Sequence, residues 1–508
     1  MNPVFKTDAY KVSHKKFETE GTKFVQANFT PRSFRLAPIN IDKAVVFGTQ
    51  RMVKRLVDMW DKEFFNRHKD DVINEAYRVF SKYLGMKKDD LEHFGKLHDL
   101  GYLPLEFRGL PEGTLVSEKM PILLMKNTHE DFSWLVTYLE TWISTEMWLP
   151  MTSATTIYHF RKLVNEWAVK TMGSTDGTEF QLHDFSYRGM GPDEAGASGA
   201  GFLLSSLGTD SIPAIIELET YYNTDIDKEP IAFSVPATEH SVTCVGIAVN
   251  GEIETMRKWI TEDYPTGIVS IVSDTLDYWK VITEYAKDLK DDILNRVPNE
   301  VGLAKVVFRP DSGDPVKVLT GYMEEEYYVE EDGTCISYGD GKELSEAEIK
   351  GSVECLWDIF GGTKTEQGYK VLHERVGLIY GDSITYEKAQ QIFERLEKKG
   401  FASLNVVLGV GSYTMRYVTR DSLGSAVKVT WAKVGAKSYP VSKDPITDSG
   451  VKKSAHGFLD VVEDDGELKL IENQDEKVSQ DSAMIDYLNN GIVSSCETLS
   501  GIRERMWG

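Results

Sequence analysis

Five short segments of the sequence have the residue types and spacing to perform chemistry. Arginine can grip a phosphate group, carboxylates can hold a hard cation or sugar hydroxyls, and glycine lets backbone N–H groups approach a phosphate. Each segment alone also has an ordinary structural explanation, such as a turn or a helix cap. The segments are residues 183–189 (HDFSYRG), 208–210 (GTD), 234–241 (SVPATEHS), 273–274 (SD) with 309–315 (RPDSGDP), and 381–382 (GD) with 409–411 (GVG).

His240 stands where the sequence predicts the start of a helix. The apolar run 231–235 (IAFSV) predicts a buried strand, Pro236 follows it as a turn, and Thr238 is the expected N-cap. Free backbone N–H groups and the helix dipole attract anions at such a position. A histidine there can exchange a proton or accept a phosphoryl group. The alternative is a structural histidine that is hydrogen-bonded to a loop carbonyl.

The five segments follow short apolar runs that predict β-strands, and helix-length segments separate these runs. A helix with one apolar face is expected at residues 386–399, ended by Gly400. Strand, polar loop and helix in repetition are typical of an α/β barrel, whose site lies on the loops after the strands. The predicted strands are residues 180–184, 231–235, 268–273, 305–308, 376–380 and 404–408.

Outside residues 178–414 the sequence pattern differs from that of the barrel region. It predicts longer helices, and strands in which apolar and polar residues alternate. Helices are expected at residues 134–148 and 157–171, and a terminal helix near 482–489. Within the barrel region, residues 322–362 read as an acidic insertion. It should contain a hairpin that turns at Asp332 and Gly333, and then a helix that starts with the capping box of Ser345 and Glu348.

Composition and charge limit the classes of function. The chain has 508 residues, 41% of them hydrophobic, which suits one large or two moderate globular domains. A net charge of −23 argues against an extended surface for nucleic acid or anionic membrane, so a polyanionic ligand needs a local cluster of Arg and Lys. The four scattered cysteines and the lack of an apolar run of ~20 residues predict a cytoplasmic enzyme with reduced thiols. The cysteines are Cys244, Cys335, Cys355 and Cys496.

Taken together and in this order, the five segments resemble the nicotinamide phosphoribosyltransferases of the type II phosphoribosyltransferase family. The resemblance begins at residues 7–14 (TDAYKVSH) and continues to residues 443–445 (KDP), with 322–362 as an insertion. It implies an irregular α/β barrel (178–414) joined to a β-rich, partly helical outer domain made from both chain ends (1–177 and 415–508). It also implies a head-to-tail homodimer whose two active sites each use residues of both subunits.

The resemblance implies transfer of the phosphoribosyl group of phosphoribosyl pyrophosphate (PRPP) to nicotinamide, which gives nicotinamide mononucleotide and pyrophosphate and serves NAD salvage. Phe185, with Tyr10 of the other subunit, is expected to sandwich the nicotinamide ring. Asp8 is assigned to the same subsite. Asp210 should accept a hydrogen bond from the amide and repel the carboxylate of nicotinate.

The resemblance also assigns the groups that bind PRPP. Its transition state should resemble an oxocarbenium ion, so positioning and charge stabilisation matter more than proton transfer. Arg309, and Arg188 from the other subunit, are expected to grip phosphates. The remaining assignments are Gly409 and Gly411 for the 5′-phosphate, Gly381 and Asp382 for the ribose, Asp274 and Asp311 for Mg²⁺ and ribose hydroxyls, and His240, Asp274, Arg309 and Asp311 as the catalytic set.

ATP is the last ligand that the resemblance implies. The histidine equivalent to His240 is phosphorylated by ATP in the family, and ATP hydrolysis drives synthesis. Two alternatives stay open at this point: a nicotinate phosphoribosyltransferase on the same fold, and a non-catalytic phosphosugar-binding protein. The expected cations of the ATP phosphate site are Arg32, Arg420, Lys428 and Lys443, with Lys452 or Lys453.

Overall fold

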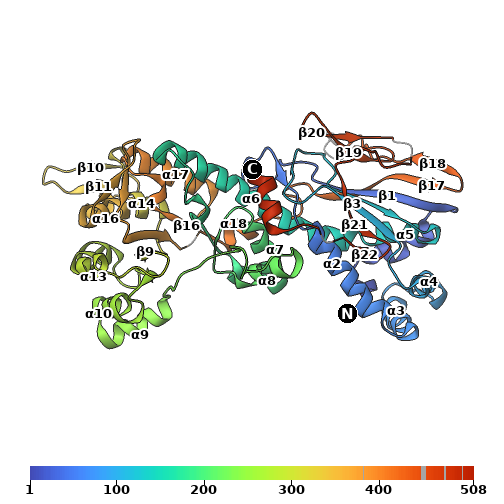
Figure 1. The fold of residues 1–508 in the computed structure, drawn as a ribbon, viewed down its shortest axis with the longest axis horizontal. Helices are drawn as coiled ribbons and strands as arrows, with labels where there is room; N and C mark the ends of the chain where they lie inside the picture. Colours follow the sequence, from blue (N-terminus) through green and yellow to red (C-terminus); the bar gives the residue numbers. More distant parts are fainter. Residues whose placement is uncertain (382, 448–452, 474–475, 495) are drawn as a thin grey trace.

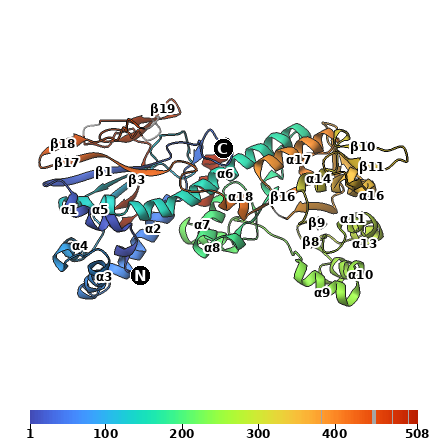
Figure 2. The same cartoon turned by 180° about the vertical axis from the view of Figure 1, so that it is seen from behind.

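The chain forms a β-rich unit and a parallel-sheet unit that lie at opposite ends of an elongated molecule (Figure 1). The computed structural model describes residues 1–381, 383–447, 453–473, 476–494 and 496–508. The long helix α6 (Glu140–Met172) runs between the two units, and the view from behind shows the same arrangement (Figure 2). The C-terminus lies near the middle of the molecule, beside α6.

Strands from both ends of the chain share one seven-stranded sheet in the β-rich unit. β1 pairs antiparallel with β17 on one side and with β5 on the other, so the first strand of the chain lies against one from its last hundred residues. In order across the sheet the strands are β18 (Lys437–Pro440), β17 (Ala426–Val434), β1 (Thr22–Thr30), β5 (Leu123–Asn127), β3 (Leu105–Gly109), β21 (Ile485–Asn489) and β22 (Ile492–Val493).

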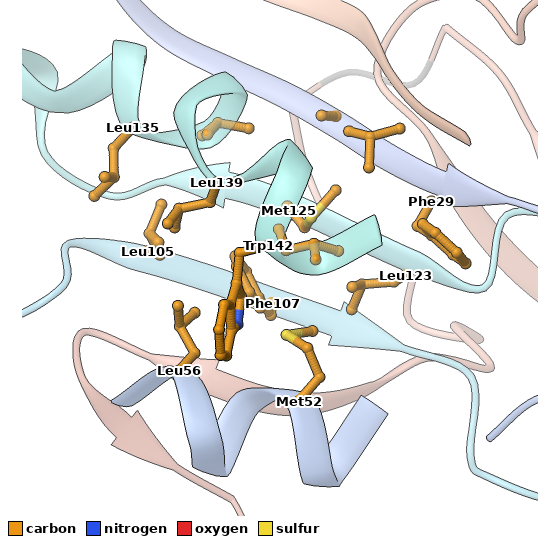
Figure 3. Packing of buried hydrophobic residues seen from close by; sticks show 14 of the residues in the cluster. Phe29, Met52, Leu56, Leu105, Phe107, Leu123, Met125, Leu135, Leu139 and Trp142 are labelled. Atoms are coloured by element: carbon orange, nitrogen blue, oxygen red, sulfur yellow. The ribbon is translucent and has the colours of Figure 1, made fainter. Parts of the chain in front are cut away.

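The core of this unit lies between the sheet and the helices that cover it. Figure 3 shows Met52 and Leu56 of α2 (Thr49–Trp60) gathered with side chains of the strands. Burying each of these side chains contributes roughly 1.5–3 kcal/mol, which makes this contact a main source of stability. The strands contribute Phe29, Leu105, Phe107, Leu123 and Met125, and the covering helices contribute Leu135, Leu139 and Trp142.

Helix α6 continues through a proline and corrects the sequence prediction of two helices. The structure has a short α5 (Ser133–Tyr138) and then 33 helical residues with Pro150 inside. A proline removes one N–H and normally breaks or bends a helix. Here the neighbouring Leu149 and Met151 are buried, and Gly48 makes room for the proline ring, because a Cβ there would lie 2.8 Å from Pro150 Cγ. Tertiary packing therefore keeps the helix continuous.

The second unit is built on six parallel strands, as the expected α/β barrel requires. Their carboxyl ends share one edge, so the loops that follow them meet there. In order across the sheet the strands are β7 (Gly208–Thr209), β6 (Leu182–Phe185), β16 (Val407–Gly411), β15 (Val376–Tyr380), β9 (Ala304–Arg309) and β8 (Gly267–Val272).

The run 231–235, predicted as a buried strand, is not a strand. Phe233 makes one parallel bridge to Gly208 at one edge of the sheet, and Ala237 makes one to Ser270 at the other edge. Pro236 lacks the N–H that a ladder needs, and the side chain of Phe233 is 50% exposed. Residues 233–237 therefore link the two edges irregularly. They are called the closing segment below.

Helices and the acidic insertion cover the outside of the parallel sheet. α17 (Tyr386–Lys398) is capped by Thr385 and buries its predicted apolar face. The hairpin turns as expected, but the predicted helix after Ser345 is divided at Gly351 (φ +77°). Arg395 of α17 holds the hairpin through Glu326, with 2.6 Å between Nη2 and Oε2. The elements of the insertion are β10 (Tyr327–Val329), β11 (Cys335–Ser337), β12 (Glu343–Leu344), α15 (Glu346–Lys350) and α16 (Ser352–Phe360).

The predicted terminal helix near residues 482–489 is wrong. Those residues include β21, which pairs antiparallel with β3, and the terminal helix is α19 (Leu499–Trp507). α19 packs on the turn at Gly113, where a Cβ would lie 2.6 Å from the carbonyl oxygen of Ile502. No helix in the described part of the chain combines the length and the apolar character that crossing a membrane requires.

The remaining elements complete the two units. In the β-rich unit they are β2 (Ala44–Val45), β4 (Leu115–Val116), α3 (Lys69–Tyr83), α4 (Glu92–Leu100), β19 (Asp460–Asp464) and β20 (Glu467–Ile471). Around the parallel sheet they include α7 (Pro192–Phe202), α8 (Ile212–Tyr221), α9 (His240–Asn250), α10 (Glu252–Lys258), α13 (Lys290–Leu294), α14 (Pro315–Thr320) and α18 (Ser412–Arg416).

Candidate active site

A cavity of about 970 Å³ opens at the carboxyl ends of the parallel strands. It is lined by loops from four of the five segments that the sequence analysis selected, together with residues 237–241 of the remaining one. Asp382, expected at the ribose, lies outside the described residues. The predicted site residues that line the cavity are Phe185, Arg188, Asp210, His240, Arg309, Asp311, Gly381 and Gly411.

Asp210 and Phe185 lie on neighbouring strand ends of this cavity. One oxygen of Asp210, Oδ1, accepts hydrogen bonds from His183 Nε2 at 3.0 Å and from Ser234 Oγ at 2.5 Å. Burial acts to raise the pKa of Asp210, but the hydrogen bonds from His183 and Ser234, with the charges of His183 and Arg309, bring that pKa below its usual value. The cavity therefore contains a carboxylate that is ionised at neutral pH, beside an aromatic ring.

Asp184 is a site residue that the sequence analysis did not identify. Its buried carboxylate accepts the Ser186 N–H at 2.8 Å and the Thr209 hydroxyl at 3.2 Å. Its backbone carbonyl accepts the Asp210 N–H at 3.0 Å. Asp184 thus fixes the loops that carry Phe185 and Asp210. The sequence feature that could have indicated Asp184 is an aspartate at the end of an apolar strand.

Gly409 makes room for Phe185. A Cβ at residue 409 would lie 2.4 Å from the carbonyl oxygen of Tyr380 and 3.0 Å from Phe185 Cδ2. This is a steric reason for glycine that the sequence analysis did not give. Gly411 is two residues further along β16, and it lines the cavity together with Ser412.

His240 is the first residue of α9, and a buried carboxylate holds its ring. Its Nε2 lies 3.1 Å from Asp274 Oδ1, and its side chain is 47% exposed, against 3% for Asp274. The expected N-cap, Thr238, is wrong, because Glu239 occupies that position. Thr238 instead accepts the Val272 N–H at 2.9 Å through its hydroxyl, which ties the closing segment to β8.

Asp274 connects His240 to the loop after β9. Its second oxygen, Oδ2, accepts the backbone N–H of Asp311 at 2.9 Å and the hydroxyl of Ser312 at 2.6 Å. Arg309, at the end of the same strand, donates from Nη2 to the carbonyl oxygen of Thr238. Its buried Nε has no acceptor among the described residues. An anion in the cavity would satisfy such a donor.

Arg188 lies on the same cavity as Asp210 and Arg309 of its own chain. The expectation that it reaches the site of the other subunit stays a prediction. It belongs to the short turn Tyr187–Gly189, which directly follows the strand that carries Phe185. A single chain thus supplies two guanidinium groups to the cavity.

The carboxylates of the cavity fit a cation only in part. Both oxygens of Asp274 are engaged by His240 and by the loop after β9. Asp311 lines the cavity, and Gly381 leaves it space, because a Cβ there would lie 2.7 Å from Asp311 Oδ1. The described residues contain no group of three or more His, Cys, Asp or Glu that could hold a metal ion. The arrangement suits Mg²⁺ that is carried mainly by substrate phosphates, with Asp311 as a ligand.

The predicted cations of the ATP site form a second cluster, in the β-rich unit. Burial lowers the pKa of Lys428, Glu140 opposes that shift, and the charges of Arg32, Lys443 and Lys11 lower it further. Lys428 is therefore close enough to Arg32, Lys443 and Lys11 to be repelled by them, and Arg32 and Lys443 are two of the other predicted cations. An anion bound among them would offset this repulsion.

Tyr10 and Asp8 lie in the β-rich unit, and neither lines the cavity. Asp8 accepts a hydrogen bond from Thr141 at 2.7 Å, and Tyr10 is 60% exposed. Burial, Asp8 and Glu140 raise the pKa of the Tyr10 hydroxyl, while the charge of Arg420 opposes them. Arg420 is therefore near Tyr10. Lys452 lies outside the described residues, and the exposed Lys453 pairs with Asp444 at 3.3 Å.

The contact of Gly409 with Phe185 gives a testable expectation. Gly409→Ala should displace the ring or the strand and destabilise the protein by roughly 1–3 kcal/mol, as overpacking does. Thermal unfolding measures this change. Gly339→Ala is a matched control, because the nearest atom to its Cβ would be Ser337 Oγ at 3.8 Å. Equal melting temperatures of the two variants would contradict the steric role.

Two full-length relatives carry the name nicotinamide phosphoribosyltransferase. The protein from Acinetobacter baylyi is 46% identical over 511 residues, which cover 100% of this chain and 97% of that protein. The protein from Xanthomonas campestris pv. campestris is 30% identical and covers 99% of this chain and 97% of its own length. The similarity is thus not confined to the site loops.

Solved structures with low sequence identity share the fold. Nicotinate-nucleotide pyrophosphorylase from Pyrococcus furiosus superposes with a TM-score of 0.56 at 14% identity, covering 99% of this chain and 94% of that one. Human nicotinic acid phosphoribosyltransferase superposes with a TM-score of 0.51 at 14% identity. The superposition covers 98% of this chain and 92% of that one. These likenesses confirm the predicted fold class. Residues 180–487 match the nicotinate phosphoribosyltransferase (NAPRTase) family, and the chain belongs to that family.

Proposed function

We propose that the protein transfers the phosphoribosyl group of PRPP to nicotinamide. The ring nitrogen of nicotinamide forms a bond to C1′ of the ribose, and the bond from C1′ to pyrophosphate breaks with its electron pair on the leaving oxygen. The products are nicotinamide mononucleotide and pyrophosphate. The observation that carries the proposal is the ionised Asp210 beside Phe185, and the names of the relatives support it.

Asp210 favours the amide over the acid. Its carboxylate can accept an N–H from nicotinamide, whereas the carboxylate of nicotinate would meet a like charge. Two such charges about 4 Å apart repel by on the order of 4 kcal/mol at an effective dielectric constant of 20. That energy corresponds to more than a hundredfold difference in binding, since each 1.4 kcal/mol is about tenfold. Phe185 supplies a face for the ring of either substrate.

The two arginines of the cavity suit the phosphates of PRPP. The buried Nε of Arg309 and the guanidinium of Arg188 can contact the leaving pyrophosphate or the 5′-phosphate. They would offset negative charge as it grows on the leaving group, while the ribose becomes cationic. Mg²⁺, when bound, would neutralise part of the pyrophosphate charge, and Asp311 is the carboxylate suited to hold it.

We infer that His240 is the acceptor in an ATP-coupled step. Asp274 binds Nε2, which orients the ring and leaves the other nitrogen to attack the terminal phosphorus of ATP. A phosphorus–nitrogen bond forms, and ADP leaves with the electron pair of the broken bond. The start of α9 offers free N–H groups to the transferred phosphoryl group.

We further infer that two copies of the chain form the working unit. Tyr10, Asp8 and the cluster of Arg32, Lys428 and Lys443 do not line the cavity of their own chain. A second copy that brings its cluster to this cavity would complete both sites. The surface for such contact includes apolar side chains that are at least half exposed on α8 and α9, namely Ile212, Ile216, Val242, Val245 and Val249.

The nearest alternative is a nicotinate phosphoribosyltransferase, the activity for which the matched family is named. The charge of Asp210 is the observation against it. A non-catalytic phosphosugar-binding protein is a second alternative, and the group of His240, Arg309 and Asp311 around one cavity argues against it. Assays with nicotinamide and nicotinate side by side separate the three, since a binding protein forms neither mononucleotide.

Asp210→Asn and Asp210→Ser remove the charge that discriminates between the two substrates. We expect the ratio of kcat/KM for nicotinamide to that for nicotinate to fall by at least about tenfold. Steady-state kinetics with both substrates measure this ratio. Asp176→Asn, which neutralises an exposed aspartate outside the cavity, is the control. An unchanged ratio in both Asp210 variants would refute the specificity argument.

His240→Ala should separate ATP coupling from the transfer itself. We expect the variant to lose ATP hydrolysis and ATP-stimulated synthesis, because the phosphoryl acceptor is gone, and to keep some basal transfer. The readouts are ADP release and mononucleotide formation with and without ATP. His68→Ala, at an exposed position before α3, controls for loss of a histidine. ATP stimulation that survives in His240→Ala is incompatible with the proposed step.

Mixed dimers test whether the sites are shared. Arg309→Ala damages the cavity and Lys428→Ala damages the cationic cluster, so each variant alone should have little ATP-stimulated activity. Random mixing gives half heterodimers with one intact site each, so about a quarter of the wild-type activity should return. Co-expression with two different affinity tags isolates the heterodimer. An isolated heterodimer without activity, or a purely monomeric wild-type protein, argues against shared sites.

A further inference from the structure

His183 lies beside the cavity, and the proposed reaction gives its side chain no role. It lies in β6, and its side chain is only 12% exposed. Its ring centroid is 4.6 Å from that of Phe185, and its Nε2 lies 3.0 Å from Asp210 Oδ1. It therefore contacts both groups that would hold the nicotinamide ring.

Two donors from separate segments converge on the same oxygen of Asp210. His183 Nε2 comes from β6, and Ser234 Oγ comes from the closing segment at 2.5 Å. Within the described residues, no donor is assigned to the other oxygen, Oδ2. Because Oδ1 is held on both sides, rotation of the carboxylate would break two hydrogen bonds at once. The orientation that leaves Oδ2 for a ligand is thus the stable one.

The ring of His183 is itself fixed by packing. A Cβ at Gly208 would lie 2.8 Å from His183 Nδ1, so the glycine allows the ring to lie directly against the backbone of β7. A carboxylate accepts but does not donate, so the ring nitrogen that faces Asp210, Nε2, carries a proton. The ring then presents one N–H donor to Asp210 and one face to Phe185.

We propose that His183 is a positioning residue that sets nicotinamide binding by holding the carboxylate of Asp210. This proposal rests on the proposed function, and it assigns His183 no contact with the reacting atoms. It separates two properties of the side chain. The N–H donor should matter for nicotinamide binding, whereas the flat ring should matter mainly for packing against Phe185.

Two substitutions separate the donor from the ring. His183→Phe keeps a flat ring and loses the N–H, whereas His183→Gln loses the ring and keeps a side-chain N–H at similar reach. We expect His183→Phe to raise KM for nicotinamide about tenfold, with kcat and the KM for PRPP within about threefold of wild type. His183→Gln should stay within about threefold of wild type on every parameter. Equal defects in the two variants would overturn the proposal.

A double-mutant cycle tests whether His183 acts through Asp210. In the Asp210→Asn background, His183→Phe should change kcat/KM for nicotinamide by no more than about twofold, since the group that it holds is already altered. A further tenfold loss there would overturn the proposal. Thermal unfolding of each variant identifies any that does not fold, and for such a variant His183→Leu replaces His183→Phe in the same comparison.

The design also separates this proposal from the proposed function. Failure of the wild-type protein to form nicotinamide mononucleotide would refute the proposed function itself. An active wild type, with His183→Phe and wild type alike in KM for nicotinamide, would refute only the role of His183.

Discussion

Two hydrogen bonds to one carboxylate oxygen connect three parts of the parallel-sheet unit that are far apart in the sequence. His183 lies in β6, Asp210 follows β7, and Ser234 belongs to the closing segment. Backbone hydrogen bonds of Phe233 and Pro236 attach the closing segment to the two edges of the sheet, and the bond from Ser234 to Asp210 adds a side-chain contact. The bonds that keep Asp210 ionised therefore also help to close the barrel. Substrate recognition and local stability depend on the same atoms.

The predicted binding groups form two separate clusters, one at the cavity and one around Lys428. The net charge of the chain explains why its cations are gathered locally. The chain carries a net charge of −23, so cations can gather only where local contacts hold them. Lys11 is 3% exposed and pairs with Glu140 at 2.6 Å, which anchors the cluster around Lys428. Removing Glu140 would be costly, because the buried Lys11 would then be an uncompensated charge. The cluster therefore persists in the free protein, ready for an anion.

The sequence predicts the parts of the site that depend on strand ends, because apolar runs followed by polar residues are local signals. It is less informative where distant contacts override local preference. Pro150 should end a helix, yet packing carries α6 through it, and Pro236 prevents the ladder that its apolar neighbours suggest. A sequence also does not specify which chain reaches a cavity, and in this structure Arg188 lines the cavity of its own chain. Asp184 was missed because its partners lie in other segments.

The fold and the substrate choice rest on different numbers of residues. Structures that share only 14% identity with this chain keep the fold over nearly its whole length, so most residues can change without losing it. In the proposed function, the choice between amide and acid depends instead on the charge of one side chain, Asp210, and on the donors that hold it. A shared fold therefore cannot assign the substrate of a family member. The proposal therefore rests on the ionisation and orientation of this one carboxylate, which would act at the atoms by which the two candidate substrates differ.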